Sequence, residues 1–479
     1  MLPMTNPATA VPLDYPTPSP IGQRPTRVRF IVMAFLCALA FLSYFDRVCI
    51  ARVQGDIQRD LHLGDQQIGV VLSIFWLGYA VFEIPGGWMG DRFGSRLTLT
   101  RIVLAWSLFT ALSGAAMGFA SLFAYRLLFG AGEAGAFPNM ARVQSNWLPA
   151  QSRARAGGLL WLVARWGGAL SFVLFGSMVA GFDSPGFRHL LASLGLSHGI
   201  QTIPSWRLGF WVLGLAGLVW VALFLPWFRD FPAQKFSVNA AELHLIRSGD
   251  PRNGHAPTGH GDSRVWGALF VSWNLWAIAL AYLCVSFGWS FFVSWMPRYM
   301  ENVHHVSYKA SQIMDTLPLF FGGMACLLGG LLSDAVVRRT GWTRFGRVIF
   351  PIVGYLTAAT AMFGIRLAHT PGQAVTLMCI ASAANDFGQG ACWATIISVG
   401  GLYAGTAFGF MNMVGNSGNF LQPVIGAAVF HHFGWGALFA LYAGVYFTAA
   451  LLWIFIRPTR QFYSWSEPEL RAFPVKMKM

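Results

Sequence analysis

The sequence predicts an all-α polytopic membrane protein with 12 transmembrane helices, arranged as two pseudo-symmetric bundles of six. Three observations predict this fold class. Of the 479 residues, 55% are hydrophobic and 11% are charged, whereas soluble globular proteins carry about 25% charged residues. Twelve apolar stretches have about the 20 residues that a helix needs to cross a bilayer. A Gly-x-x-x-Asp pattern also recurs at corresponding positions of the two halves.

The predicted spans account for most of the chain. They lie near residues 29–49, 66–90, 96–117, 121–141, 156–181, 207–228, 267–296, 310–334, 346–366, 371–398, 402–430 and 434–456. A long polar stretch separates the sixth span from the seventh. The expected organisation is, in order, a Pro- and Thr-rich disordered tail (1–28), a first bundle (29–228), a linker (229–266), a second bundle (267–457) and a tail (458–479). The sequence does not indicate a function for the loop 184–205.

Basic residues indicate how the chain is oriented in the membrane. The net charge is +14, but arginine and lysine do not form one patch that would bind a nucleic acid. They are concentrated in the two tails and in the loops that follow even-numbered spans. Cytoplasmic loops carry such an excess of arginine and lysine, so both termini are expected to be cytoplasmic.

Cysteine and histidine give no sign of a metal site or an enzyme. All six cysteines fall in or beside apolar spans without metal-ligand spacing, and the histidines lie mostly in loops. We therefore predict no metal, no cofactor and no catalytic residues. A membrane-embedded enzyme is the remote alternative, and it would need a nucleophile–histidine or metal constellation near the membrane face.

The repeated glycine–aspartate pattern predicts a gate at one membrane face. Glycine lets two helices approach closely, and an aspartate at a helix end can pair with an arginine or with the N-terminus of a neighbouring helix. Parallel repeats mark transporters whose halves rock around a central site. The alternative is a charged turn without a gating role. The predicted gate residues are Gly87, Asp91, Arg92, Gly94 and Arg96 in the first half and Gly330, Asp334 and Arg338 in the second.

Four charged residues in the first and fourth predicted spans are candidates for a function: Asp46, Arg47, Arg126 and Glu133. A charge at the centre of a membrane helix costs roughly 2.5–3.5 kcal/mol, which suggests that these residues have a function. Arg126 and Glu133 are seven positions apart and return to one helix face within about 20°, so both are expected to point into one cavity. Tyr44 and Arg47 share a face at i, i+3, whereas Asp46 is turned about 100° away from Arg47.

The chemistry of these four residues suits an anion and a proton. An arginine stays protonated and binds a carboxylate with two parallel hydrogen bonds, so Arg47 and Arg126 are the predicted anion-binding pair. A buried carboxyl group changes its charge with its surroundings, so Asp46 and Glu133 are the predicted proton carriers. The alternative is a set of structural ion pairs that brace the helices.

Several motifs make the chain similar to the major facilitator superfamily over residues 29–457, and within it to the anion:cation symporters. The motifs include Tyr44-Phe-Asp-Arg47, Pro85-Gly-Gly-Trp88 and Gly130-Ala-Gly-Glu-Ala-Gly-Ala-Phe-Pro138. The resemblance implies a monomeric importer of a sugar acid, such as a hexonate, hexarate or hexuronate, in a bacterial inner membrane. The proton gradient would supply the energy. The resemblance also implies substrate hydrogen bonds from Tyr44 and Tyr79 and substrate contacts from Trp393 and Asn412.

The second half is expected to bind the uncharged part of the substrate. It offers amides and an indole in place of charges, and the candidates are Gln389, Trp393, Asn412 and Asn416. Because amides and indoles form hydrogen bonds with hydroxyl groups, this half suits a polyhydroxylated acid. The alternative is amide bonding between neighbouring helices.

Arg165, inside the fifth span, is a further candidate. It would add a third cation to the cavity, as a dianionic substrate would require, or it would pair with Glu83 or Asp386. An anion exchanger or an exporter without proton coupling is the alternative function for the whole constellation. The second acid, Glu133, favours symport because a symporter needs a group that takes up and releases a proton.

Overall fold

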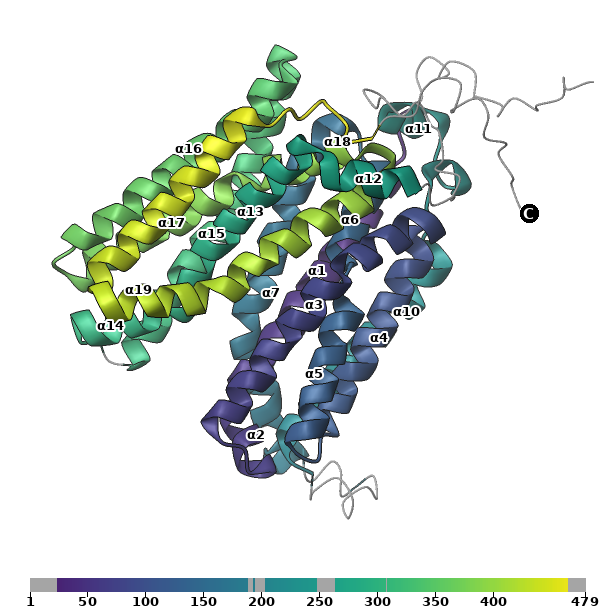
Figure 1. Ribbon diagram of the computed structural model, residues 1–479. Coiled ribbons are helices and arrows are strands. Elements are labelled where there is room, and N and C mark those ends of the chain that lie inside the picture. The colour runs from purple at the N-terminus through teal and green to yellow at the C-terminus, as the bar shows by residue number, and fades with distance from the viewer. Residues whose placement is uncertain (1–23, 188–192, 194–202, 248–262, 307, 464–479) are drawn as a thin grey trace, which may run out of the picture.

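The computed structural model describes residues 24–187, 193, 203–247, 263–306 and 308–463, and every regular element among them is helical. The helices form two bundles that lie next to each other (Figure 1). The first bundle contains α1 (Val28–Arg52), α3 (Asp65–Phe93), α4 (Ser95–Gly114), α5 (Phe119–Glu133), α6 (Ala136–Trp147), α7 (Arg153–Phe182) and α10 (Ser205–Trp227). The second contains α12 (Ser263–Val271), α13 (Trp273–Ser294), α15 (Tyr308–Thr340), α16 (Thr343–Gly364), α17 (Pro371–Phe387), α18 (Gln389–Gly400) and α19 (Ala404–Phe455). Shorter helices are α2 (Gln54–Leu61), α11 (Ala240–Arg247) and α14 (Met296–His304).

The helices follow the predicted spans and confirm the all-α membrane fold. Within the described residues, nine helical stretches are long and apolar enough to cross a membrane, the last being Pro371–Phe455. That stretch covers the last three predicted spans, because α17, α18 and α19 follow one another closely and Gly434 kinks α19 with a φ of +72°. Most of both predicted tails and most of the loop 184–205 lie outside the described residues.

The predicted continuous helix at 121–141 is wrong, because the chain forms two helices there. α5 ends at Glu133 and α6 begins at Ala136. Between them, Gly135 adopts a φ of +85°, a left-handed conformation that favours glycine. A Cβ atom on Gly135 would also overlap the backbone of Gly86 on α3. The break therefore brings α3 and the start of α6 into backbone contact beside Glu133.

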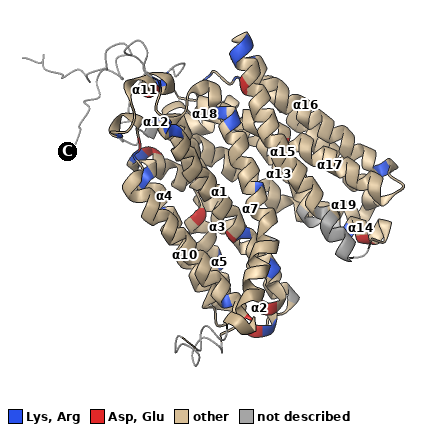
Figure 2. Cartoon of the chain, turned by 180° about the vertical axis from the view of Figure 1, so that it is seen from behind, with Lys and Arg blue, Asp and Glu red and all other residues tan. Residues whose placement is uncertain are grey.

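Charged side chains are concentrated at the ends of the helices, and few lie along their middles (Figure 2). This distribution is expected for a chain that crosses a bilayer, where a buried charge is costly. The charged residues that are buried within the bundles are therefore the candidates for a function. They include Asp46, Glu83, Arg126, Glu133, Arg165 and Asp386. Of these, Glu133 and Asp386 lie where α5 and α17 end inside the bundles.

The two bundles converge toward the face that carries α11 and diverge toward the opposite face, where α2 and α14 lie (Figure 1). We call the first of these the linker face. Two backbone contacts between the bundles are related by the internal repeat. A Cβ atom on Gly87 of α3 would overlap the carbonyl of Gly405 on α19, and one on Gly330 of α15 would overlap the carbonyl of Ala154 on α7. Glycine is therefore required at both positions, as its capacity for close helix approach predicts.

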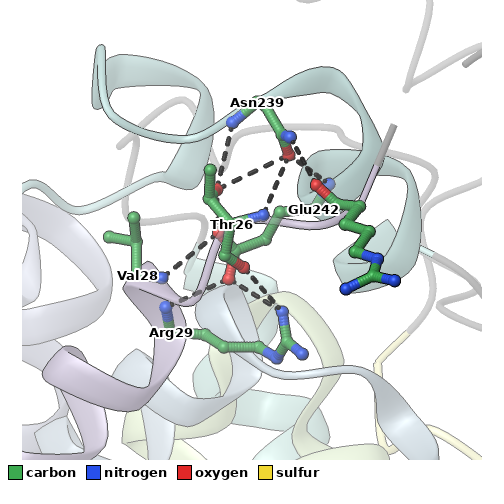
Figure 3. Close-up of polar contacts among 6 residues, drawn as sticks. Thr26, Val28, Arg29, Asn239 and Glu242 are labelled. Atoms are coloured by element: carbon green, nitrogen blue, oxygen red, sulfur yellow. Dashed lines mark hydrogen bonds and ion pairs between the residues drawn. The ribbon is translucent and has the colours of Figure 1, made fainter. Parts of the chain in front are cut away.

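The linker is anchored to the first bundle by Glu242 of α11 (Figure 3). Its buried carboxylate accepts hydrogen bonds from the Thr26 hydroxyl and from the backbone N–H groups of Val28 at 3.3 Å and Arg29 at 3.2 Å. The Arg29 guanidinium also pairs with it at 2.8 Å. The first N–H groups of a helix have no partner within the helix, and the N-terminus favours a negative charge. Glu242 therefore accepts the hydrogen bonds of the first backbone N–H groups of α1.

Candidate functional site

A cavity lies between the two bundles, about midway along the membrane-spanning helices. Its walls are aromatic and polar, and both bundles contribute to them. The lining residues are Tyr44, Arg47, Trp76, Tyr79, Phe137, Trp161 and Arg165 from the first bundle and Tyr282, Val285, Ser286, Trp289, Gln389, Asn412, Asn416 and Asn419 from the second. Both arginines come from the first bundle, and all the amides come from the second. The cavity therefore presents cations on one side and neutral hydrogen-bonding groups on the other.

Arg47 is the charged centre of the first wall. Its Nε lies 2.9 Å from Oε1 of Glu133, and the Ser43 hydroxyl donates to the same oxygen. The guanidinium carbon lies 4.2 Å from the ring centroid of Tyr79 and 5.1 Å from that of Tyr44. The side chain of Arg47 is only 8% exposed, and its Nη2 has no hydrogen-bond partner among the described residues. A guanidinium nitrogen without a partner in a lined cavity suits an anionic oxygen of a ligand.

Asp46 and Arg126 lie behind this wall, inside the first bundle. Both are 2% exposed and are within electrostatic range of each other and of Glu133. The Arg126 guanidinium covers the ring of Phe129 at 4.6 Å. The prediction that Arg126 and Glu133 both point into the cavity is therefore wrong for this conformation, because neither side chain lines it.

The packing of α5 explains this difference. Arg126, Gly130 and Glu133 do share one face, but a Cβ atom on Gly130 would overlap the carbonyl of Phe75 on α3. That face is consequently pressed against helices of its own bundle. Helical phase correctly placed Arg126 and Glu133 on one face, but it carried no information about which neighbour that face would meet.

The amides of the second wall lie on adjacent turns of α19. Asn412 donates to Oε1 of Glu83 at 2.7 Å and to the Tyr79 hydroxyl at 3.3 Å, so it connects the two bundles. The Asn416 amide donates to the carbonyl of Asn412 at 2.8 Å. Gln389, at the start of α18, also lines the cavity. Of the polar substrate candidates, Gln389, Asn412, Asn416, Tyr44 and Tyr79 therefore all reach the cavity.

Trp393 is the other candidate that lies outside the lining. Its indole Nε1 donates to Oε1 of Gln144 on α6 at 2.8 Å, and its ring packs against Phe408 with the centroids 4.6 Å apart. The ring is 2% exposed. Trp393 thus closes the contact between the bundles on the linker-face side of the cavity, where α6 and α18 meet.

Arg165 lies in the cavity wall and is paired with Asp386. Arg165 Nε is 3.1 Å from Asp386 Oδ2, and Nη2 is 3.0 Å from Oδ1. Glu83, the other partner considered from the sequence, is bonded to Asn412 instead. The guanidinium also lies over the ring of Trp289 at 4.4 Å. Arg165 is on α7 of the first bundle, whereas Asp386 and Trp289 are on α17 and α13 of the second. This cation therefore connects the two bundles at the level of the cavity.

Sequence reasoning missed most of the aromatic walls of the cavity. The aromatic residues missed are Trp76, Phe137, Trp161, Tyr282 and Trp289, and the polar ones are Ser286 and Asn419. Aromatic residues in apolar spans usually pack against neighbouring helices, and their sequence spacing does not distinguish that use from a cavity wall. The arrangement of the two bundles alone selects them.

Asp91, the first of the two aspartates predicted to form a gate, connects the two bundles at the linker face. It pairs with Arg142 of α6, and its Oδ2 accepts hydrogen bonds from the backbone N–H and the hydroxyl of Thr406, both at 2.6 Å. Thr406 lies at the start of α19, so one carboxylate joins an arginine of its own bundle to a helix N-terminus of the other. These are the two types of partner that the sequence predicts for Asp91.

Asp334 makes the equivalent contacts in the second half. Its Oδ1 lies 2.7 Å from Nη1 of Arg347, and its Oδ2 accepts a hydrogen bond from the backbone N–H of Arg155 at 2.8 Å. Arg155 lies at the start of α7 in the first bundle. The two aspartates therefore hold the start of α19 and the start of α7, and together they close the linker face.

The basic residues of the sequence pattern are not the partners of the gate aspartates. Arg92 and Arg338 are exposed, and the arginines that pair with the two aspartates are Arg142 and Arg347. Arg96 instead donates to the carbonyl of Leu225 at 2.9 and 2.7 Å. Its backbone N–H donates to Asp230 at 2.9 Å, beside Gly94 with its φ of +87°. Burial raises the pKa of the Asp230 carboxyl, and this N–H opposes that rise.

Two bundles around a charged cavity, closed at one face by paired carboxylates, define a membrane transporter and not an enzyme. Residues 36–423 match the model of the Major Facilitator Superfamily, and the chain belongs to this family. It is 31% identical over 408 residues to a probable sulfoacetate transporter of Cupriavidus necator, covering 83% of this chain and 86% of that protein. It is 27% identical to the hexuronate transporter of Bacillus subtilis, covering 89% and 94%. It is also 27% identical to the D-galactonate transporter of Escherichia coli, covering 90% and 96%.

Solved structures share the fold at lower sequence identity. The proton:xylose symporter XylE matches with a TM-score of 0.68 and 18% identity, over 93% of this chain and 98% of that one. The fucose transporter FucP in its outward conformation matches with a TM-score of 0.68 and 17% identity, over 90% and 99%. These likenesses confirm the major facilitator fold for nearly the whole chain.

Proposed function

We propose that this chain is a monomeric, proton-coupled symporter that imports an organic anion by alternating access. A sugar acid such as a hexonate, hexarate or hexuronate is the expected substrate. The observation that carries the proposal is the bonding of Arg47, whose guanidinium lines the cavity. Its Nε is paired with Glu133, and its Nη2 has no hydrogen-bond partner among the described groups. An incoming carboxylate would compete with Glu133 for Arg47, and a Glu133 released in this way would accept a proton.

The walls of the cavity support a substrate that is charged at one end and polar at the other. Arg47 would bind the anionic group, with Tyr44 and Tyr79 beside it. Gln389, Asn412 and Asn416 would bind hydroxyl groups from the opposite wall. Relatives named for hexuronate and galactonate support this class of substrate. A relative named for sulfoacetate supports a small dianion as a competing substrate, for which Arg165 would supply the second cation.

We further propose that the linker face is cytoplasmic and that the membrane is a bacterial inner membrane. Arginine and lysine crowd the loops on that side, as cytoplasmic loops do. Because the gate aspartates close this face, the conformation described here would then be outward-facing. Asp46 and Arg126, buried behind Arg47, would contribute to proton coupling by changing the charge around Glu133.

Uptake into proteoliposomes tests the proposal. Glucarate, galactonate, glucuronate, sulfoacetate, an aromatic acid and phosphate would each be offered with and without an inward proton gradient. We expect one of the organic anions to be concentrated only when the gradient is present. Uptake that is indifferent to the gradient but is stimulated by internal substrate would instead identify an anion exchanger.

A further inference from the structure

Glu83 is a buried carboxyl group for which the proposed mechanism has no use. It lies on α3, is 0% exposed, and follows the cavity-lining Tyr79 by four residues. Its Oε1 accepts the hydrogen bond from Asn412 of the other bundle at 2.7 Å. No donor in the described part of the chain reaches its Oε2, which is also buried. A buried carboxylate with an unsatisfied oxygen is costly, and the neutral acid is less so.

The charges around Glu83 do not offset that cost. Arg47 of α1 and Glu133 of α5 are both within electrostatic range and act on Glu83 in opposite directions, Arg47 favouring the ionised form and Glu133 the neutral one. Arg47 is also already paired with Glu133. The remaining titratable neighbours are Tyr79 on α3, which is a hydrogen-bonding neighbour of Glu83, and Tyr282 on α13; both are uncharged near neutral pH. An ionised Glu83 in this closed site would therefore share the nearby cation Arg47 with Glu133, with which Arg47 is in direct contact.

The position of Glu83 connects this group to the gate. α3 and α19 touch along one line that runs from Asn412 to Asp91. A Cβ atom on Gly409 would lie 2.6 Å from the carbonyl oxygen of Glu83, and further along Gly87 meets Gly405 and Asp91 holds Thr406. Glu83 lies at the cavity end of this contact. Water can reach its carboxyl group from the linker face only if α3 and α19 separate.

We propose that Glu83 is a third proton-binding group of this transporter, which favours the closed gate when it is protonated and favours opening when it is ionised. The inference rests on the proposed proton-coupled function for its role in transport. The step is a proton transfer alone: the carboxylate takes up a proton before the gate closes over it, and water at the linker face accepts that proton when the gate opens. Asn412 of α19 donates a hydrogen bond to Glu83 in the closed state. Separation of α19 from α3 would therefore break this hydrogen bond and change the surroundings of the Glu83 carboxyl group.

Hydrogen exchange of the full-length protein in lipid nanodiscs tests this inference without any substrate. The readout is exchange of the amides in 404–411 between pH 5 and pH 8, after correction for the intrinsic pH dependence of exchange. An acid whose proton affinity differs tenfold between the closed and open gate shifts the gate equilibrium by the same factor. We therefore expect exchange of this segment to rise about tenfold with pH in the wild type and to stay slow and flat in Glu83→Gln.

Two further variants make the result decisive. Glu83→Asp remains titratable and should keep a pH-dependent profile, and Glu301→Gln, at an exposed glutamate of α14 far in sequence from both α3 and α19, should keep it as well. A flat wild-type profile, or a Glu83→Gln profile that still rises like the wild type, would overturn the inference. If uptake proves independent of the proton gradient while Glu83→Gln still abolishes the pH response, the proposed symport fails and the assignment of Glu83 stands.

Discussion

Arg165 and Asp386 form a two-pronged ion pair between the two bundles at the cavity wall, with Nε–Oδ2 and Nη2–Oδ1 distances of 3.1 and 3.0 Å. Arg165 belongs to α7 of the first bundle and Asp386 to α17 of the second. The two side chains are 6% and 1% exposed. Any rocking motion that separates the bundles at this level must break the ion pair. Arg165 would then need another anionic partner, and an anionic group of the substrate could replace Asp386.

Single substitutions in this pair should be more harmful than their combination. Arg165→Gln leaves Asp386 buried without a cation, with the Asn385 amide still donating to its Oδ1 at 2.7 Å. Breaking a buried ion pair on one side costs about 3–5 kcal/mol, so the thermal stability of this variant in detergent should fall markedly. The double variant with Asp386→Asn leaves no unpaired charge and should recover most of that loss. If Arg165 binds substrate, the double variant should still show a KM raised about tenfold, because hydrogen bonds to charged groups contribute about 1.5–3 kcal/mol.

A double variant with wild-type KM would remove Arg165 from the substrate site and leave it with a structural role. Arg59→Gln is the matched control. Arg59 pairs with Asp56 at the opposite face, but its side chain is 81% exposed, and exposed pairs contribute about 0–1 kcal/mol.

Glu133→Gln should abolish accumulation of substrate under a proton gradient while leaving exchange of internal for external substrate. The amide keeps an oxygen for Arg47 but cannot take up a proton at neutral pH. We expect the concentration ratio across the membrane to fall at least about tenfold, the free-energy equivalent of one unit of pH gradient. Glu301→Gln, at an exposed glutamate of α14, is the control. Accumulation that survives in Glu133→Gln would show that another group carries the proton.

The two gate aspartates should each stabilise a different helix end. Asp91→Asn should increase amide exchange at 404–409, because the start of α19 loses its carboxylate partner, and Asp334→Asn should do so at 153–157 of α7. Loss of a capping side chain costs about 1 kcal/mol, so exchange should rise about fivefold in the segment concerned. Equal loosening of both segments in both variants would mean that the gate opens as one unit.

Removing the linker anchor should lower the stability of the first bundle. Glu242→Ala leaves the first N–H groups of α1 and the Arg29 guanidinium without their acceptor, and we expect a loss of about 2–3 kcal/mol. Glu242→Gln keeps one acceptor oxygen and should lose less. Thermal unfolding in detergent measures both variants, and trypsin cleavage of the linker should accelerate in the same order. Equal stability of Glu242→Ala and the wild type would contradict the anchoring role.

Much of the fold could be predicted because bilayer crossing depends on local composition. The apolar spans located the helices, and the repeated glycines located the contacts of Gly87 and Gly330 between the bundles. The break at Gly135 was not predictable, since it depends on the approach of Gly86 from another helix. The gate aspartates were found, but Arg142 and Arg347 were missed as their partners, because pairing across helices depends on how each helix is rotated.

The sequence by itself determined the membrane class, the two related halves and the set of charges that must be buried. These follow from hydropathy and from helical phase, which are properties of each segment alone. Only the tertiary structure decided how those charges are used. In the tertiary structure Arg47 pairs with Glu133, and Arg165 pairs with Asp386. Arg126 points into the interior of the first bundle, and Glu83 accepts a hydrogen bond from Asn412. The physical reason is that phase tells which residues share a face, whereas packing against neighbouring helices decides what that face meets.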